Sequence, residues 1–276
     1  MRVDVSEVKA RAGCGRKWSF NSRNFFHLRP KEFPKALHFG TVFHTALARM
    51  YKGNDIDWIL ECAIKELEDP KDKKMIEAMV GGYYSGPYQE DKEEYIVIDI
   101  ESRFRFLLDT TDDTEIAGSI DLVVQRKADG MIFGFEHKTT TNFRPEIYNL
   151  MDEQPRVYHE ALVQFCEKHN YQFGGIVLNE VRKLTRGFQF NRSLCKYDAA
   201  DQKHFLNEFE RRVLEIITDV DCGNQPYPKP GFFDCQMCEF SEVCAKYGYR
   251  PVTLEMILEL CGDDFQVRTV DHLEEK

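Results

Sequence analysis

The sequence predicts a mixed α/β fold: a central β-sheet flanked by helices, with an appendix that carries cysteines. Three observations support this prediction. The hydrophobic pattern has a helical period over residues 39–80, becomes strand-like between residues 94 and 138, and then alternates between the two. The length of 276 residues allows one large domain or two small ones with a sizeable core. Three cysteines stand close together near the C-terminal end, in CQMCEFSEVC.

The composition is that of a folded chain without a membrane segment. Hydrophobic residues make up 42% and charged residues 30%, which is ordinary for a globular protein. The first residues, MRVDVSEVKARAGC, lack the apolar stretch of a signal peptide, and no window approaches the ~18 apolar residues of a membrane span. We therefore expect a cytoplasmic location (host cytoplasm if the chain is viral), no membrane partner, and no disulfides among the nine cysteines.

The charge is uneven along the chain. The formal net charge of −10 argues against a wholly basic coat for nucleic acid, although a local basic groove is compatible with it. Residues 1–35 hold nine Lys and Arg and three acids, whereas residues 252–276 hold seven acids and two basic residues. On charge alone, two solvated faces of opposite sign explain this pattern better than the alternative, a phosphate-contacting surface near the N-terminus.

The first third of the chain is predicted to be helical. Short helices broken at Gly13 and Gly15 are expected over residues 5–26. Apolar residues at helical spacing predict a helix over residues 39–53. Residues 55–80 continue this helical pattern, and the aromatic segment GGYYSGPYQE is expected to be a loop.

The period then changes to that of strands. Strand-like segments cover residues 94–108, 115–127 and 131–138, and a two-residue turn at Asp129-Gly130 joins the last two. We expect one domain over residues 1–250 and, over residues 251–276, an acidic helical tail that is a candidate contact for a protein partner. The remaining expected elements are a helix over 152–169 with Pro155 in its first turn, strands over 173–183 and 187–193, an amphipathic helix over 198–217, and the loop NQPYPKPG.

The predicted hairpin brings three polar side chains together. With a two-residue turn, Asp121 falls opposite Lys138, and Val123 falls opposite Glu136. Directly opposed residues and residues two apart share a face, so Asp121, Glu136 and Lys138 are expected on one face. This placement requires a turn with an even number of residues. The apolar residues expected on the other face are Ile120, Leu122, Val124, Phe133 and Phe135.

Two carboxylates and a lysine in this arrangement suit phosphodiester hydrolysis. The carboxylates can share a hard divalent cation such as Mg²⁺ or Mn²⁺, which neutralises phosphoryl charge and acidifies water. The lysine can orient the attacking water or stabilise charge that builds up on the phosphorus. Taken alone, however, the trio is explained slightly better by a solvent-exposed sheet face with a cross-strand ion pair.

Further residues extend the pattern. The set GSIDLVV…GFEHK resembles the core of the PD-(D/E)XK nucleases, with Asp121 as the first acid and Glu136-x-Lys138 as the second half. Within that superfamily it is similar to the RecB-like branch, which has a histidine on an upstream helix and a Q-x-x-x-Y motif after the lysine strand. The chain supplies these features as His44 in FGTVFHTAL and as Gln154 and Tyr158 in QPRVY.

The resemblance implies a restriction-endonuclease-like core and a set of roles. His44, Asp121, Glu136 and the backbone carbonyl of His137 would hold Mg²⁺ or Mn²⁺. The catalytic set would be Asp121, Glu136, Lys138, Gln154 and Tyr158. One residue departs from the family pattern, since the position between the glutamate and the lysine is usually apolar and here is His137. Strand alternation points its side chain to the opposite face, so it is expected to lie in the core or to support the ligands.

The cysteine spacing indicates a metal site. Three closely spaced thiolates in Cys235-x₂-Cys238-x₅-Cys244 are typical of such sites. The iron–sulfur members of this nuclease branch place one cysteine near the N-terminus and three near the C-terminus, which implies Cys14 as the fourth ligand and a [4Fe–4S] cluster joining the two ends. Zinc is the alternative, because spacing does not separate the two. The remaining cysteines, Cys62, Cys166, Cys195, Cys222 and Cys261, are expected to be buried small apolar residues.

The resemblance implies a free-standing, metal-dependent DNA exonuclease, similar to CRISPR-adaptation nucleases and to the nuclease domain of recombination helicase-nucleases. The substrate would be DNA, as single strands or ends, and the pathways implied are recombination, repair, CRISPR adaptation or viral genome processing. The alternatives are a catalytically silent nuclease-like DNA-binding adaptor and a zinc-stabilised interaction module. Candidate phosphate contacts, equally well explained as solvated surface charge, are Arg11, Arg16, Lys17, Arg182, Lys183 and Arg186.

Overall fold

A computed structural model of the chain describes residues 1–31, 34–107 and 114–268, and the chain divides into two compact units. The sheet unit comprises Lys35–Phe106 and Ala117–Phe205, and the terminal unit comprises Met1–Pro34, Leu107–Ile116 and Leu206–Lys276. Both units contribute to the single domain predicted for residues 1–250, and that boundary stays a prediction.

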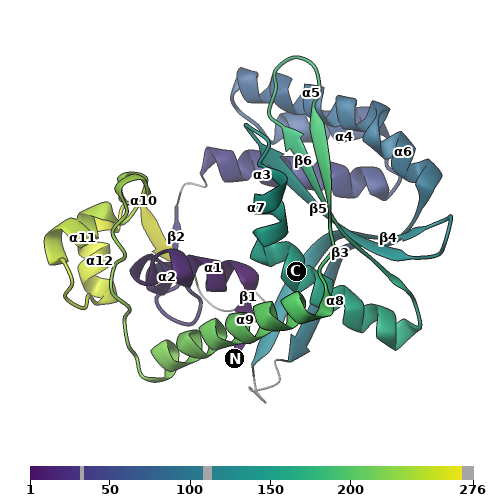
Figure 1. Cartoon of the computed structure of the whole chain (residues 1–276). Helices are drawn as coiled ribbons and strands as arrows, with labels where there is room; N and C mark the ends of the chain where they lie inside the picture. Colours follow the sequence, from purple (N-terminus) through teal and green to yellow (C-terminus); the bar gives the residue numbers. More distant parts are fainter. Residues whose placement is uncertain (32–33, 108–113, 269–276) are drawn as a thin grey trace. The chain divides into compact units, whose positions relative to one another are not determined.

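The centre of the sheet unit is a mixed β-sheet (Figure 1). β3 pairs with β4, and the strand order continues β4-β5-β6-β7. β4 and β5 are antiparallel, β5 and β6 are parallel, and β6 and β7 are antiparallel. The bounds are β3 Tyr95–Leu107, β4 Glu115–Arg126, β5 Ile132–Thr140, β6 Phe173–Arg182 and β7 Phe190–Cys195.

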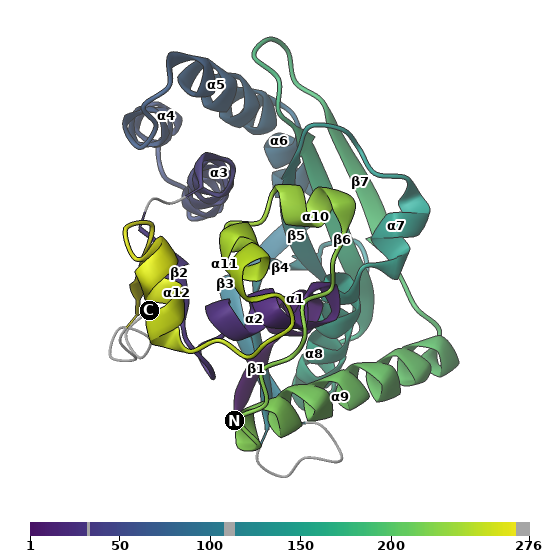
Figure 2. The same cartoon turned by 90° about the vertical axis from the view of Figure 1, so that its left-hand side faces the viewer.

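Helices cover both faces of this sheet. α8 (Glu153–His169), which connects β5 to β6, buries Tyr158 and Leu162 against alternate residues of β4 to β6, among them Val123. On the other face, Leu122 packs in a separate cluster that Tyr51 of α3 touches. Figure 2 shows α3 close to end-on beside α4 and α5. The mixed sheet with flanking helices confirms the predicted fold class. The other helices of the unit are α3 Lys35–Tyr51, α4 Ile56–Lys65, α5 Pro70–Ser85, α6 Pro87–Glu94 and α7 Glu146–Met151.

One predicted loop is helical. The segment GGYYSGPYQE (residues 81–90) continues α5 to Ser85 and starts α6 at Pro87. The prediction was wrong because Tyr83 and Tyr88 are buried in the core that α3 to α6 share, and that burial outweighs the weak helix propensity of the glycines. Pro87 is tolerated because it stands in the first turn of α6, where its missing N–H has no helical partner.

The terminal unit joins the two ends of the chain. β2 and β8 pair antiparallel, and Phe20 and Leu28 from the N-terminal side share a core with Val243, Ile257 and Phe265 from the C-terminal side. Both views place α2 near α11 and α12 (Figures 1 and 2). The bounds are β1 Arg2–Asp4, α1 Val5–Gly13, α2 Gly15–Asn21, β2 Leu28–Pro30, α9 Ala199–Asp221 (beginning in the sheet unit), α10 Phe232–Gln236, α11 Ser241–Tyr247, α12 Leu254–Cys261 and β8 Phe265–Val267.

The described part of the expected acidic tail belongs to this core. α12 buries Ile257 and Cys261, and β8 buries Phe265. The tail is helical, as predicted. It is not separate, however, because the apolar residues between its acids pack in one core with residues from the N-terminal side. Residues 269–276 of the tail lie outside the described residues. No helix in the described ranges is long and apolar enough to cross a bilayer.

Candidate active site

His44 lies on α3, whose orientation is set by its apolar residues. Phe43, Leu47 and Met50 recur at helical spacing and are at most 1% exposed. Nδ1 of His44 lies 3.3 Å from Oδ2 of Asp121 on β4. Burial alone lowers the pKa of His44, but the hydrogen bond and the charge of Asp121 outweigh it, so the pKa is raised above its ordinary value.

Asp121 is held from two sides. Besides its contact with His44, its Oδ2 accepts a hydrogen bond of 2.7 Å from the backbone N–H of His137. Burial raises the pKa of Asp121, but His44 and His137 lower it further than burial raises it. Asp121 is therefore ionised at neutral pH, and an ionised carboxylate is a suitable ligand for a hard cation.

Lys138 is held between Glu136 and the helix α8. Its Nζ donates to Oε1 of Glu136 at 2.6 Å and to Oε1 of Gln154 at 2.7 Å. Nε2 of Gln154 donates to the same oxygen of Glu136 at 2.9 Å and to the hydroxyl of Tyr158 at 2.7 Å. Gln154 and Tyr158 stand one helical turn apart, so their four-residue spacing places both on the same face of α8. The structure thus brings together four of the residues that the motif predicts.

Glu136 is the most deeply buried acid of the group. Its side chain is 4% exposed, and its Oε2 has no hydrogen-bond partner among the described residues. Burial, and then the charge of Asp121, raise the pKa of Glu136 to about 7 although Lys138 lowers it. A buried carboxylate oxygen without a partner is unfavourable, so this atom is a candidate contact for a cation.

His137 points away from this group, as strand alternation predicts. Its ring is 2% exposed and stacks on Tyr51 at 6.1 Å with 13° between the planes. Its Nδ1 lies 2.9 Å from Nδ2 of Asn179 on β6. Burial lowers the pKa of His137 to about 4, so the ring is neutral at pH 7. The role of its backbone carbonyl as a ligand stays a prediction.

A buried polar network lies behind His137. Nδ2 of Asn179 also donates to the hydroxyl of Tyr83 at 3.1 Å, and Nε of Arg192 donates to Oδ1 of Asn179 at 3.3 Å. Arg192 forms two hydrogen bonds of 2.7 Å with the carboxylate of Asp91, which is 3% exposed. The network helps to explain why a polar residue is tolerated between Glu136 and Lys138, since the amide of Asn179 satisfies Nδ1 of His137 and is itself held by Tyr83 and Arg192.

The predicted hairpin register was wrong by two residues. Val123 pairs with Gly134 rather than with Glu136. The turn is longer than two residues, because Arg126 N–H donates to the carbonyl of Met131 and the loop between them holds residues 127–130. An even shift keeps Glu136 and Lys138 on the face of Val123. Ile120 nevertheless packs in the same cluster as Val123, three residues further along β4. The alternation of side chains between the two faces therefore breaks between them, and it does not by itself decide on which face Asp121 lies.

A groove of about 730 Å³ in the sheet unit opens beside these residues, and its lining includes His44, Asp121 and Lys138. Its cations include Lys52, which the sequence analysis did not identify. Lys52 lies two turns after His44, so helical spacing would have placed both on one stripe of the helix predicted over residues 39–53. Lys183, a predicted phosphate contact, also lines the groove.

Glu101 is a second residue that the sequence analysis missed. It lines the same groove from β3. Burial and the charge of Asp121 raise the pKa of Glu101, and His44 lowers it, so the three groups are close enough to interact. Its backbone has φ +56°, a left-handed conformation that is uncommon for a residue other than glycine. No feature of the local pattern marks this position, because the outlier arises within a strand-like segment.

The family assignment follows from comparison with known proteins. The model of the PD-(D/E)XK nuclease superfamily matches residues 2–245, which include every residue of the candidate active site. The chain belongs to the PD-(D/E)XK nuclease superfamily.

A solved structure shares the fold of this PD-(D/E)XK chain. A crystal structure from Eubacterium rectale, described as a “putative exonuclease”, has a TM-score of 0.54 and 14% identity, over 93% of this chain and 91% of that one. The crystal structure of SSO0001 has a TM-score of 0.46 and 14% identity, over 91% of this chain and 88% of that one. No curated protein matches the chain.

PD-(D/E)XK nucleases typically use a divalent metal, and the donors present here suit one. Within the described ranges, no three His, Cys, Asp or Glu side chains gather closely enough to form a complete site. The available donors are nevertheless those that a hard cation prefers: the ionised Asp121, the unpartnered Oε2 of Glu136, and the ring of His44.

The four predicted cluster cysteines of this PD-(D/E)XK chain line one pocket. The pocket has a volume of about 220 Å³ and lies in the terminal unit. Cys14 is extended between α1 and α2, and its Sγ accepts from the backbone N–H of Lys229 at 3.5 Å. Sγ of Cys235 accepts from the N–H of Gly231 at 3.4 Å. Cys238 and Cys244 complete the thiol lining of the pocket.

The other five cysteines are separate from this pocket. None of the nine cysteines, all of which are described, forms a disulfide, as predicted. Cys166, Cys195 and Cys261 are buried as expected. Cys222 is exposed and Cys62 is half-buried, so the expectation of burial was wrong for these two. Both stand on or beside helices, where one face meets solvent whatever the residue type.

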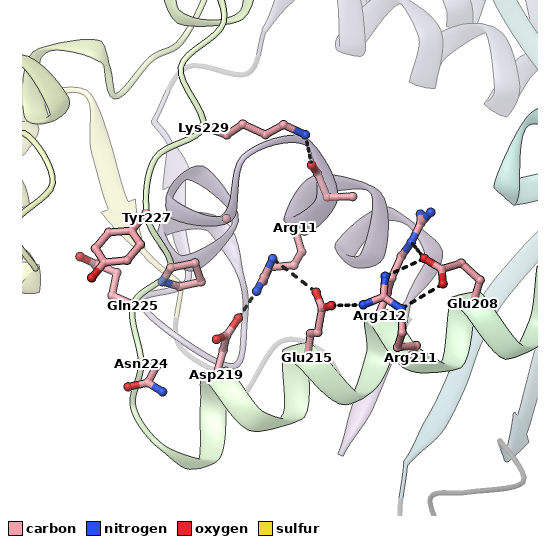
Figure 3. A pocket seen from close by; sticks show the side chains of 13 residues that line it. Arg11, Glu208, Arg211, Arg212, Glu215, Asp219, Asn224, Gln225, Tyr227 and Lys229 are labelled. Atoms are coloured by element: carbon pink, nitrogen blue, oxygen red, sulfur yellow. Dashed lines mark hydrogen bonds and ion pairs between the residues drawn. The ribbon is translucent and has the colours of Figure 1, made fainter.

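Most of the predicted phosphate contacts are engaged within the protein. Figure 3 shows Arg11 directed toward Asp219 and Glu215, and its Nε donates to Asp219 at 2.7 Å. Lys17 pairs with Glu239 at 2.8 Å. Arg16 is 1% exposed, so its assignment as a surface contact was wrong. Of the remaining three candidates, Arg182 donates to neighbouring loop atoms, Lys183 lines the groove and Arg186 is exposed.

Proposed function

We propose that this chain is a divalent-metal-dependent nuclease that cleaves DNA, most simply as an exonuclease acting on single strands or ends. The observation that carries the proposal is the position of Lys138, whose Nζ is held between Glu136 and Gln154 at the edge of a groove with further cations. A lysine fixed in this way can donate to a phosphoryl oxygen or to the attacking water as negative charge develops.

The other residues support this lysine or the phosphate. Gln154 holds the ammonium group from α8, and Tyr158 holds the amide of Gln154. Lys52 and Lys183 give the groove positive charge that can attract the DNA backbone. A divalent cation, held when bound by Asp121, Glu136 and His44, supplies charge that offsets the phosphate and acidifies water.

Lys138→Ala tests this proposal. We expect cleavage of end-labelled DNA in Mg²⁺ or Mn²⁺ to fall by about 10²-fold or more, because an electrostatic donor to the transition state is lost. Lys65→Ala is the matched control, since Lys65 is exposed and pairs with Glu61 one turn away. Full activity of Lys138→Ala, with an unchanged circular dichroism spectrum, refutes the assignment of the site.

The form of the substrate separates the rival functions. Digestion of linear but not circular DNA, as single and double strands, is expected for an exonuclease. Binding of DNA without cleavage under any metal condition identifies the adaptor alternative instead. Capture of a protein partner by the full-length chain, without nuclease activity, identifies the interaction module.

We further propose that Cys14, Cys235, Cys238 and Cys244 hold a [4Fe–4S] cluster. The support is that all four thiols line one pocket of about 220 Å³, which is far larger than the ~10–15 Å³ that a single water requires. Backbone N–H groups aimed at Cys14 and Cys235 are typical partners of cluster thiolates. Anaerobic purification with iron, sulfide and zinc analysis decides between the cluster and zinc: colourless protein with stoichiometric zinc refutes the cluster.

A further inference from the structure

Arg16 is a buried cation without a carboxylate partner among the described residues. Its side chain, on α2, is 1% exposed. Its two terminal nitrogens donate to the backbone carbonyls of Gly248 and Arg250, and its Nε has no hydrogen-bond partner among the described residues. No carboxylate in the described ranges forms an ion pair with this guanidinium. Because an uncompensated buried charge is strongly unfavourable, the environment must supply negative charge from another source.

The surroundings of Arg16 point to that source. Arg16 lines the pocket of the four cysteines together with Lys17 and Lys229, and no Asp or Glu is among the lining residues. Cations around a pocket favour negative charge inside it, so this lining suits an anionic centre made of thiolates.

Arg16 also connects the two parts of the cysteine set. It stands two residues after Cys14, and the carbonyls that it holds lie in the segment directly after α11, which carries Cys244. Gly248 has φ +58°, a left-handed conformation that glycine adopts without strain. That turn ends α11 and presents the Gly248 carbonyl to the guanidinium. One side chain therefore joins the N-terminal cysteine to the segment with the other three.

We infer that Arg16 is the positioning residue of the four-cysteine centre: its guanidinium balances the thiolate charge and ties α2 to the segment after α11. This inference rests on the metal centre proposed above and holds for iron–sulfur and zinc alike, since both require thiolates. A planar guanidinium can bridge two carbonyls at once, which the single ammonium of lysine does less well.

The test compares Arg16→Gln and Arg16→Lys with the wild-type chain. Each full-length protein is loaded anaerobically with iron and sulfide or with zinc, and metal content and the rate of metal release to a chelator are measured. Lys246→Gln is the matched control, because Lys246 is an exposed cation on α11 that does not line the pocket. We expect Arg16→Gln to lose metal about 10- to 100-fold faster, the usual effect of removing a residue that supports metal ligands. The rate of metal release from Arg16→Lys should lie between those of the wild type and Arg16→Gln. The rate from Lys246→Gln should match that of the wild type.

The outcomes separate the two claims. A wild-type chain that retains neither iron nor zinc overturns the metal centre and the role of Arg16 together. A metal-loaded wild type with an equally slow release from folded Arg16→Gln overturns only the role of Arg16. If Arg16→Gln does not fold, Arg16→Lys decides: release at the wild-type rate overturns the role, and faster release supports it.

Discussion

The buried carboxylate of Glu136 should make the metal-free protein less stable as the pH rises. Its pKa is raised from 4.5 to about 7, first by burial and then by Asp121. The folded chain therefore holds a proton on Glu136 over a pH range in which the unfolded chain has released it. The stability that this proton contributes is complete below pH 4.5 and is lost as the pH rises through about 7.

The size of the effect follows from the same pKa values. At roughly 1.36 kcal/mol for each pKa unit, a rise from 4.5 to about 7 corresponds to about 3 kcal/mol of unfolding free energy. The side chain is 4% exposed, so solvent screening does not reduce this figure much. Glu136→Gln removes the titrating group while keeping an oxygen for Lys138 and Gln154 to donate to.

The assay is urea unfolding followed by circular dichroism, in a chelator, at several pH values between 5 and 8. We expect the unfolding free energy of the wild type to fall by about 3 kcal/mol relative to that of Glu136→Gln across this range. Glu61→Gln is the control, since Glu61 is an exposed acid of the same unit, and its curve should run parallel to the wild type. If the unfolding free energy of Glu136→Gln has the same pH dependence as that of the wild type, the folded chain does not hold the extra proton on Glu136. The reasoning then fails.

Two further predictions concern the support of the site. Arg192→Met leaves the buried carboxylate of Asp91 without its cation and should lower the unfolding free energy by about 3–5 kcal/mol; a loss below about 1 kcal/mol in urea unfolding would show that the pair contributes little. Gly134→Ala places a Cβ 2.7 Å from Cδ1 of Leu162 and should cost about 1–3 kcal/mol by overpacking. Adding Leu162→Val to Gly134→Ala should recover part of that loss in the same assay, and strictly additive losses would argue against this clash.

Local patterns predicted most of the secondary structure. Period and turn residues predicted all of the sheet-unit strands, and α3 and α8 to within a few residues, because neighbouring residues decide these features. The segment GGYYSGPYQE escaped this reasoning, since its two helices form around Tyr83 and Tyr88, which a distant core buries. Such tertiary effects outweigh local propensity and are not visible in a short window.

The sequence predicted the residues of the candidate site better than it predicted their arrangement in space. The residue types and their order pointed to His44, Asp121, Glu136, Lys138 and the helix of Gln154. The register did not follow, because a turn of four residues and a break in alternation at Ile120 replaced the simple hairpin. Glu101 was not identified, since only its left-handed backbone and its place in the groove mark it.

By itself, the sequence determined the α/β class and the order of the motif residues, because each depends on spacing along the chain. Only the tertiary structure decided that Glu136 is buried with an unpartnered oxygen and that Arg16 lies beside the cysteines instead of on the surface. The physical reason is the same in both cases. The burial of a charge, and the groups that compensate it, depend on segments that are distant in sequence and meet only when the chain folds.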